Sequence, residues 1–252
     1  MKGINLNNTD ILKTNKTYWN TNADSWFGVT SLPVYGVQCV TENEVELFGD
    51  VKGKTLLEIG CGSGHSLKYH ADNNAGELWG LDLSQKQIDN AKEYLAEYNY
   101  SPKLICASME EEIGIPKNHF DIVYSIYAIG WATDLTKVFN QISGYLKKDG
   151  FFIFSWKHPL HGCVKVDEGK LVFDKSYFDE GWDTHHIDDM DIVVSNRKIS
   201  TYVNALSRAG FFIEEMIEQS DEETLNMTGD IDDRSLKAQN LPLSFIFKVR
   251  KA

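Results

Sequence analysis

The chain has 252 residues, of which 42% are hydrophobic and 25% are charged, and its formal net charge is −12 at pH 7. A chain of this length and composition buries a sizeable core in one large domain, which excludes disorder on a large scale. The negative charge argues against a nucleic acid as partner, because a phosphate backbone would be repelled.

The cysteines and the apolar stretches indicate where the protein works. Residues 1–10 are polar and lack the apolar core of a signal peptide. The longest apolar stretch, residues 120–132, is too short and too interrupted to span a bilayer. The cysteines are scattered without a CxxC pair, which predicts free thiols in a reducing compartment; they are Cys39, Cys61, Cys106 and Cys163. We therefore expect a cytoplasmic protein with no membrane partner.

A short helix is expected before residue 50. Thr41 and Glu44 fit a capping box, which predicts a helix that runs through Leu47 and Phe48. Residues 49–53 begin and end with glycine and are expected to terminate this helix. The remainder of residues 10–50 is polar and aromatic without a strong strand pattern.

From residue 54 onward, short apolar runs alternate with amphipathic segments. The apolar runs predict strands at 55–59, 77–82, 103–106, 120–125 and 151–156. The amphipathic segments predict helices at 64–73, after a capping box at Ser84, and at 135–146, with Lys147, Lys148 and Gly150 as the end signals of the last one. This alternation is typical of βαβ units in a mainly parallel sheet.

The alternation stops after residue 156. Residues 157–197 lack clear periodicity and are rich in histidine, aspartate and aromatic residues. A helix is expected over 200–209, followed by strand-like runs at 211–217 and 244–250. No helical pattern strong enough for a parallel crossover links these two runs, so we expect an antiparallel hairpin with a long polar connection.

Glycines follow the first predicted strand at every second position: Gly60, Gly62 and Gly64. Glycine allows the backbone to turn sharply and to approach a ligand closely. A dinucleotide fingerprint needs a glycine where this chain has His65, which argues against a nicotinamide-dependent dehydrogenase. Asp82 ends the second predicted strand, where a carboxylate can accept hydrogen bonds from ribose hydroxyls or simply precede a helix cap. The two motifs in register favour an adenosine-bearing ligand.

These motifs resemble the class I S-adenosylmethionine-dependent methyltransferases of the small-molecule type. The matching stretches are 56–64 (LLEIGCGSG), 80–84 (GLDLS), 120–125 (FDIVYS) and 146–151 (LKKDGF). The resemblance covers residues 54–156 and the terminal hairpin. It implies an α/β fold: a doubly wound, Rossmann-like, seven-stranded sheet, mostly parallel with an antiparallel last strand and helices on both faces. We expect a single domain over 1–252, made of a helical lid (1–50), a cofactor-binding core (54–156), an insertion (157–197), and a final helix with the hairpin (198–252).

The resemblance implies S-adenosylmethionine as cofactor, S-adenosylhomocysteine as product, and a role for each matching residue. The glycine turn, with Cys61, would lie against the methionine part, and Glu58 near its amino group. Asp82 would hold the ribose, and Leu83 the adenine. The other expected cofactor contacts are Ser108 and Met109 beside the adenine and Ser125 at the transferring methyl.

The substrate side is expected from three places: the stretch 18–26, the end of the fourth predicted strand at Tyr127, and the insertion. The stretch 18–26 resembles the family's lid, so its aromatic residues are candidates, with ordinary packing as the alternative. The insertion is the candidate recognition region, and an arginine in it would either pair with a substrate carboxylate or lie on the surface. The named candidates are Tyr18, Trp19, Trp26, Tyr127, His158, Trp182 and Arg197. His158, His161 and Tyr127 are the candidates for a general base. No metal site is expected, because the histidines and acids near 185–191 lack a ligand spacing.

Three readings of the function stay open beside a small-molecule methyltransferase. The chain could bind the cofactor as a regulatory module that has lost its substrate site. It could act on a basic protein, which an acidic surface would attract. A dehydrogenase on a related fold is disfavoured by the glycine spacing. The acceptor atom and the oligomeric state do not follow from the residues.

Overall fold

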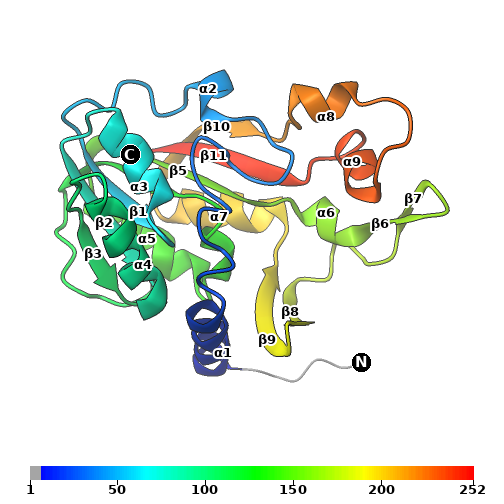
Figure 1. The fold of residues 1–252 in the computed structure, drawn as a ribbon, viewed down its shortest axis with the longest axis horizontal. Helices are drawn as coiled ribbons and strands as arrows, with labels where there is room; N and C mark the ends of the chain where they lie inside the picture. Colours follow the sequence, from blue (N-terminus) through cyan, green and yellow to red (C-terminus); the bar gives the residue numbers. More distant parts are fainter. Residues whose placement is uncertain (1–6) are drawn as a thin grey trace.

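The computed structural model describes residues 7–252, so residues 1–6 of the polar N-terminal stretch lie outside the described residues. Its centre is a seven-stranded sheet in the order β10-β11-β5-β4-β1-β2-β3 (Figure 1). Neighbouring strands are parallel except at β11, which runs antiparallel to both β10 and β5. The strands are β1 (Thr55–Ile59), β2 (Glu77–Asp82), β3 (Lys103–Cys106), β4 (Phe120–Ser125), β5 (Leu146–Lys157), β10 (Phe211–Ile217) and β11 (Ser244–Lys251). The expected sheet, with its single antiparallel strand at the C-terminus, is confirmed.

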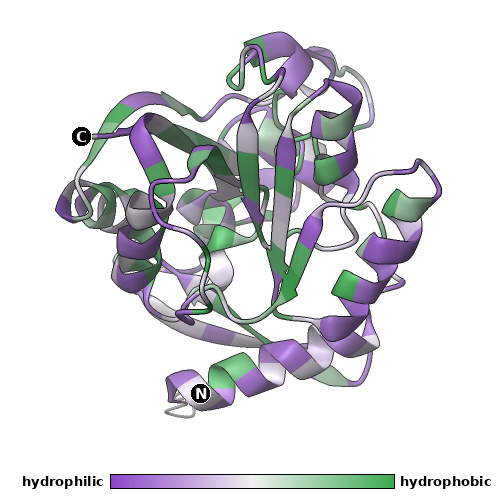
Figure 2. Ribbon diagram, turned by 90° about the vertical axis from the view of Figure 1, so that its left-hand side faces the viewer, coloured by the Kyte–Doolittle hydropathy of each residue, from purple (hydrophilic) through white to green (hydrophobic). Residues whose placement is uncertain are grey.

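Both faces of the sheet are covered. Leu57, Val123 and Phe152 pack on one face against helices α5 (Leu135–Tyr145) and α7 (Ile199–Arg208). Alternate residues of the same strands, such as Leu56 and Ile122, pack on the other face against residues 32–51. Helices α3 (His65–Asp72) and α4 (Gln85–Ala96) continue that second layer. Figure 2 shows the outer helices alternating between hydrophobic and hydrophilic residues, as one buried face requires.

The N-terminal segment differs from its prediction. It begins with α1 (Asn8–Thr21), and helix α2 (Glu42–Val45) ends before Leu47 and Phe48, so the prediction that it runs through them is wrong. The buried Glu42 carboxylate accepts the N–H groups of both residues, at 3.0 and 2.9 Å. These bonds, together with the left-handed Glu46 (φ 47°), turn the chain inward and place both apolar side chains in the core.

The insertion is built mainly from two hairpins that no periodicity predicted. It contains α6 (Pro159–Cys163), the pair β6 (Val164–Asp167) and β7 (Lys170–Phe173), and the pair β8 (Gly181–Ile187) and β9 (Met190–Asn196). Most of β8 is exposed, so it lacks the apolar alternation of a half-buried strand. The polar link between β10 and β11 likewise contains two short helices, α8 (Glu222–Asn226) and α9 (Asp233–Ala238).

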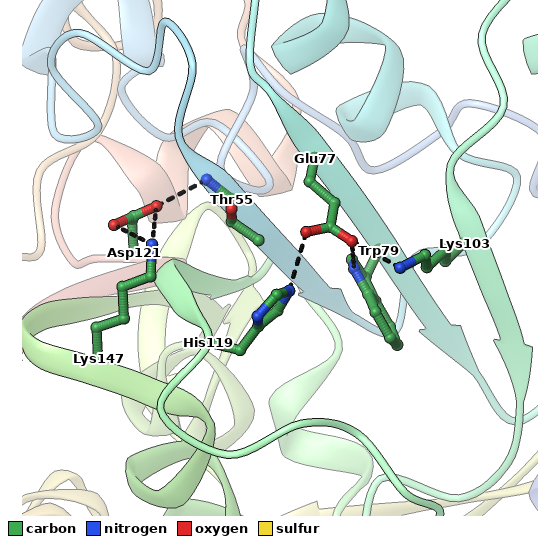
Figure 3. A network of polar contacts seen from close by, with 7 residues as sticks. All are labelled: Thr55, Glu77, Trp79, Lys103, His119, Asp121 and Lys147. Atoms are coloured by element: carbon green, nitrogen blue, oxygen red, sulfur yellow. Dashed lines mark hydrogen bonds and ion pairs between the residues drawn. The ribbon is translucent and has the colours of Figure 1, made fainter.

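A polar network closes the sheet at the edge where its parallel strands begin (Figure 3). The Glu77 carboxylate accepts hydrogen bonds from Lys103 Nζ (2.7 Å), Trp79 Nε1 (3.0 Å) and His119 Nε2 (2.9 Å). Lys103 and Trp79 lower the pKa of Glu77 to about 2. Lys147, expected as a helix-end signal, lies instead in the early part of β5, which begins at Leu146 and not at residue 151. Ligands are therefore expected at the opposite edge, where the strands end.

Candidate active site

A cavity opens at the carboxyl ends of β1, β2 and β4. It encloses about 970 Å³ including its open mouth. Its lining combines the glycine turn, the ends of β2 and β3, the segment after β4, and the N-terminal residues 12–31. This is the position at which doubly wound α/β sheets bind ligands. The cavity therefore brings together segments that are more than 100 residues apart in the sequence.

The glycine turn has a geometry that only glycine allows. Gly60 has φ +76°, and an added Cβ there would lie 2.3 Å from the Cβ of Ala128. Gly62 has φ +49°, and its N–H donates to Asp82 Oδ2 at 2.9 Å. The turn is therefore held against the end of β2 with its backbone open to the cavity.

Asp82 retains acceptor capacity. Its Oδ2 accepts the Gly62 N–H, and its Oδ1 accepts the Ser84 N–H at 2.8 Å. A carboxylate offers about four lone-pair sites, so about half remain for a ligand. Burial raises the pKa of Asp82, and the backbone N–H groups oppose that rise by stabilising the charged form.

Glu58 lies behind the cavity wall. Its side chain is 2% exposed, and it is not among the lining residues. The Tyr124 hydroxyl donates to Glu58 Oε2 at 3.3 Å. Burial raises the pKa of Glu58 well above its usual range, more than the Ser66 and Tyr124 hydroxyls lower it. Of these groups, Ser66 reaches the cavity lining.

Ser108 and Met109 line the cavity at the end of β3, together with Cys61 and Leu83. The Ser108 hydroxyl donates to the carboxylate of Glu110 at 3.1 Å. Glu110 also accepts the N–H groups that precede α5, including that of Asp134 at 3.2 Å. Glu110 thus has a structural contact to the next helix in addition to its place on the wall.

Besides Glu58, two expected cofactor residues lie outside the lining. Gly64 caps α3 with φ +82°, and a Cβ there would come within 2.9 Å of the Leu95 side chain. The Ser125 hydroxyl donates to the Ile59 carbonyl at 2.8 Å and joins the ends of β4 and β1. In this structure both residues support the turn from behind.

Residues 8–32, which we call the roof, cover the cavity. Trp19 and Trp26 line it, whereas Tyr18 is buried behind them. The Asn15 amide exchanges two hydrogen bonds, each of 2.9 Å, with the backbone of Val193 in β9. At its far end the roof is joined to α4, where Ser84 Oγ donates to Asn20 Oδ1 at 2.8 Å and Asn90 donates to Asp24 at 2.8 Å.

The roof also bonds directly to the glycine turn and α3. The Gly28 N–H donates to Ser63 Oγ at 3.1 Å, and the Leu32 N–H donates to Ser66 Oγ at 3.1 Å. Neither serine was among the predicted site residues, although both lie in or beside the glycine motif. His65 lines the same end of the cavity, with its ring stacked on Tyr94 at 4.0 Å.

Aromatic rings form the wall beyond the glycine turn. Trp131, in the 3₁₀ helix η1 (Ile129–Trp131), meets Trp19 at a ring distance of 5.4 Å, and Trp19 meets Trp26 at 5.5 Å. Tyr127 lines the cavity with a left-handed backbone (φ 53°), a conformation that is rare outside glycine and is found at functional sites. Burial raises the pKa of Tyr127, which keeps its hydroxyl protonated.

The predicted substrate and general-base residues of the insertion lie away from this cavity, because no described residue of the insertion lines it. His158 Nε2 is 2.6 Å from the Glu218 carboxylate, and His161 lies on the short helix α6. The Arg197 guanidinium donates to Ser195 Oγ at 2.8 Å and lies over the ring of Trp182 at 5.4 Å. The structure therefore separates these four residues from Trp19, Trp26 and Tyr127.

One observation indicates that the cavity suits a polar ligand. Gln87, three residues after the helix cap Ser84, lines the wall near Gly62. Its Oε1 is buried without a hydrogen-bond partner among the described residues, which is costly unless a bound group or water supplies a donor. Within residues 7–252, no group of three or more His, Cys, Asp or Glu side chains could hold a metal ion, and no helix is long and apolar enough to cross a membrane.

Comparison with known proteins identifies the family. Residues 57–154 match the family described as a methyltransferase domain. The chain is 30% identical over 168 residues to the probable S-adenosylmethionine-dependent methyltransferase CRG1 of Saccharomyces cerevisiae, covering 66% of this chain and 55% of that protein. It is 30% identical over 97 residues to the mitochondrial arginine-hydroxylase NDUFAF5 of Rattus norvegicus, covering 38% of this chain and 27% of that protein. The chain thus spans about half or less of the length of these two curated relatives.

A solved structure extends the likeness to most of the chain. It is that of a Listeria monocytogenes protein assigned to the S-adenosylmethionine-dependent methyltransferases, with a TM-score of 0.71 and 25% identity, and the match covers 84% of this chain and 96% of that one. The methyltransferase domain at residues 57–154 and the likeness to this solved structure support the class I S-adenosylmethionine-dependent methyltransferase superfamily, with S-adenosylmethionine as the cofactor.

Proposed function

We propose that the chain transfers a methyl group from S-adenosylmethionine to a small, largely apolar acceptor held inside the roofed cavity. One observation carries the proposal: Trp19, Trp26 and Trp131 wall the cavity that also contains the glycine turn and Asp82. A roofed cavity that combines aromatic walls with polar groups at one end is typical of small-molecule sites.

The cofactor end is assigned from unused hydrogen-bonding capacity. Asp82 would accept the ribose hydroxyls with its remaining lone pairs, and Gln87 Oε1 would accept a further donor. The backbone at Gly60 and Gly62 would lie against the methionine part, with Leu83 and Met109 beside the adenine. S-adenosylmethionine supplies an electrophilic methyl group on a sulfonium, and all other contributions come from the chain.

The acceptor end is assigned from the aromatic wall. The indole rings of Trp19 and Trp131 would orient an apolar acceptor and exclude water from the transfer. Alignment of two reactants is worth up to about 7–11 kcal/mol. Tyr127 stays protonated because of its burial, so we assign it to positioning rather than to proton removal.

A basic protein is the second candidate acceptor. One relative carries the name arginine-hydroxylase, and the net charge of −12 would attract a basic partner. The roof argues against it, because Asn15 and Gly28 hold the roof to β9 and to the glycine turn, and a protein side chain would have to displace it.

The test is to supply methyl-labelled S-adenosylmethionine with small aromatic amines, thiols and hydroxyl compounds, and separately with a basic protein. We expect label in a small molecule. Trp131→Ala should raise the acceptor KM by about tenfold, as loss of a buried aromatic contact does, and leave S-adenosylhomocysteine binding within about twofold. Trp79→Phe, at the opposite edge of the sheet, is the matched control. Label only in the protein, or cofactor binding without any transfer, would contradict the proposal.

A further inference from the structure

A second cavity lies within the insertion. It encloses about 910 Å³ including its open side, and it lies between the end of β5, helix α6, the segment 174–183 and the end of β9. None of its lining residues lines the first cavity. Trp156 lines the second cavity and packs against Trp131 of the first at a ring distance of 5.3 Å. These two rings therefore form part of a wall between the two spaces.

Two cations on the inner wall of this cavity have no acidic partner. None of the ion pairs found among the described residues includes Lys157 or Arg197. Arg197 donates to a hydroxyl and to the carbonyls of Gly130 and Ala132, which leaves its charge uncompensated. Lys157 is half-buried at the end of β5, and burial lowers the pKa of its ammonium group. Unpaired half-buried cations are unusual in a chain with 37 acidic and 25 basic residues.

Two of the four acidic residues of the cavity are paired with other lysines. Asp183 is paired with Lys175 at 2.8 Å, and Glu180 is paired with Lys198 at 3.0 Å. Two further carboxylates, those of Asp174 and Asp179, are exposed at the rim. The cavity is thus positive on its inner wall and negative at its entrance, a gradient that suits a ligand entering with its anionic group first.

The rim also exposes aromatic surface. The side chain of Phe173 is 71% exposed, and that of Phe178 is 79% exposed. Each lies next in sequence to a lining residue, Asp174 and Tyr177 respectively. Large apolar side chains with this exposure beside a cavity mark surfaces that gain free energy when a ligand covers them.

We propose that this second cavity binds a small molecule that carries a carboxylate or phosphate group on an aromatic or apolar body, with Lys157 as the recognition cation. The anionic group pairs with the Lys157 ammonium, beside the Arg197 guanidinium. Trp156 and Tyr202 contact the body from the inner wall, and Phe173 and Phe178 lie beside it at the rim. Because the wall separates the two cavities, this ligand binds in addition to the cofactor. The proposal does not depend on the identity of the methyl acceptor.

The test uses phenyl phosphate as the probe and isothermal titration calorimetry as the readout, with saturating S-adenosylhomocysteine present. Wild type should bind phenyl phosphate, and benzyl alcohol, which has the ring without the charge, should bind at least about tenfold more weakly. Lys157→Gln should lower the affinity for phenyl phosphate by about tenfold or more, whereas Lys157→Arg should retain most of it. Lys165→Gln, which removes an exposed lysine of β6, is the matched control and should bind as wild type does.

Each other outcome overturns the proposal. Equal binding of phenyl phosphate by wild type and Lys157→Gln shows that Lys157 is not the recognition cation. Equal binding of benzyl alcohol and phenyl phosphate shows that the site does not recognise the anionic group. Displacement of phenyl phosphate by S-adenosylhomocysteine places the probe in the first cavity. Melting temperatures of all variants, measured without probe, show whether lost binding reflects lost folding, and Lys157→Arg supplies the folded comparison if Lys157→Gln does not fold.

Discussion

Replacing Asp82 by asparagine separates its two roles, because the side chain accepts backbone N–H groups on one side and faces the cavity on the other. Asparagine keeps a single acceptor oxygen and places an NH₂ group against either the Gly62 or the Ser84 N–H. A hydrogen bond to a charged group contributes about 1.5–3 kcal/mol. Losing one of the expected ribose hydrogen bonds and removing the charge from the other therefore costs about 3 kcal/mol of binding free energy. We therefore expect S-adenosylhomocysteine to bind Asp82→Asn about 100-fold more weakly than wild type.

The assay is calorimetric titration of S-adenosylhomocysteine into wild type, Asp82→Asn and the control Asp89→Asn. Asp89 is an exposed carboxylate on α4 that accepts a hydrogen bond from Gln85. A cofactor analogue without both ribose hydroxyls should bind wild type and Asp82→Asn with nearly equal affinity. If Asp82→Asn binds S-adenosylhomocysteine within about threefold of wild type, or if the analogue shows the same loss, Asp82 does not hold the ribose.

Three further predictions concern stability. Burial raises the pKa of Glu58 above 4.5, so the unliganded wild type should lose stability as pH rises above about 4.5, whereas Glu58→Gln should not; parallel melting curves between about pH 4.5 and 8 would contradict this. Glu77 behaves in the opposite sense: Lys103 helps to hold its pKa at about 2, so its contribution is present above about pH 4.5 and is lost as pH falls toward 2. Glu77→Gln should cost about 1 kcal/mol at neutral pH, a figure reduced for the exposure of the side chain, and acid titrations followed by circular dichroism should show the difference vanish near pH 2. Asn15→Ala leaves both backbone groups of Val193 without their partners, so hydrogen exchange should show α1 opening more easily by about 2–4 kcal/mol; unchanged exchange in α1 would refute the coupling.

The core strands were predictable because their burial is local in sequence. Residues 55–59 and 120–125 are apolar on both faces and lie next to turns, which is typical of central parallel strands. The length of α2 was not predictable, because the Glu42 carboxylate that ends it is an ordinary helix-start residue until it is buried. The hairpin β8–β9 was missed for a related reason: an exposed strand has no apolar alternation to detect.

In the candidate site, too, the residues of a local motif were predictable and the long-range contacts were not. The glycine turn and Asp82 follow from a motif of neighbouring residues, and the structure brings them into contact. The pairing of Asn15 with Val193 spans 178 residues, and no local pattern predicts it. The Gln87 oxygen lacks a partner because of how the whole cavity wall is packed, which no local pattern predicts. Sequence reasoning therefore found the groups that share a motif and missed those joined only by the fold.

The roof has a kinetic consequence. Its backbone N–H groups at Gly28 and Leu32 bond to serine hydroxyls beside the glycine turn, and its helix is fastened to β9. If S-adenosylhomocysteine leaves and S-adenosylmethionine enters on this side, these hydrogen bonds break once in every catalytic cycle. The strength of these few contacts would then set a ceiling on the turnover number, and the residence time of the product would lengthen with each bond that strengthens the closure.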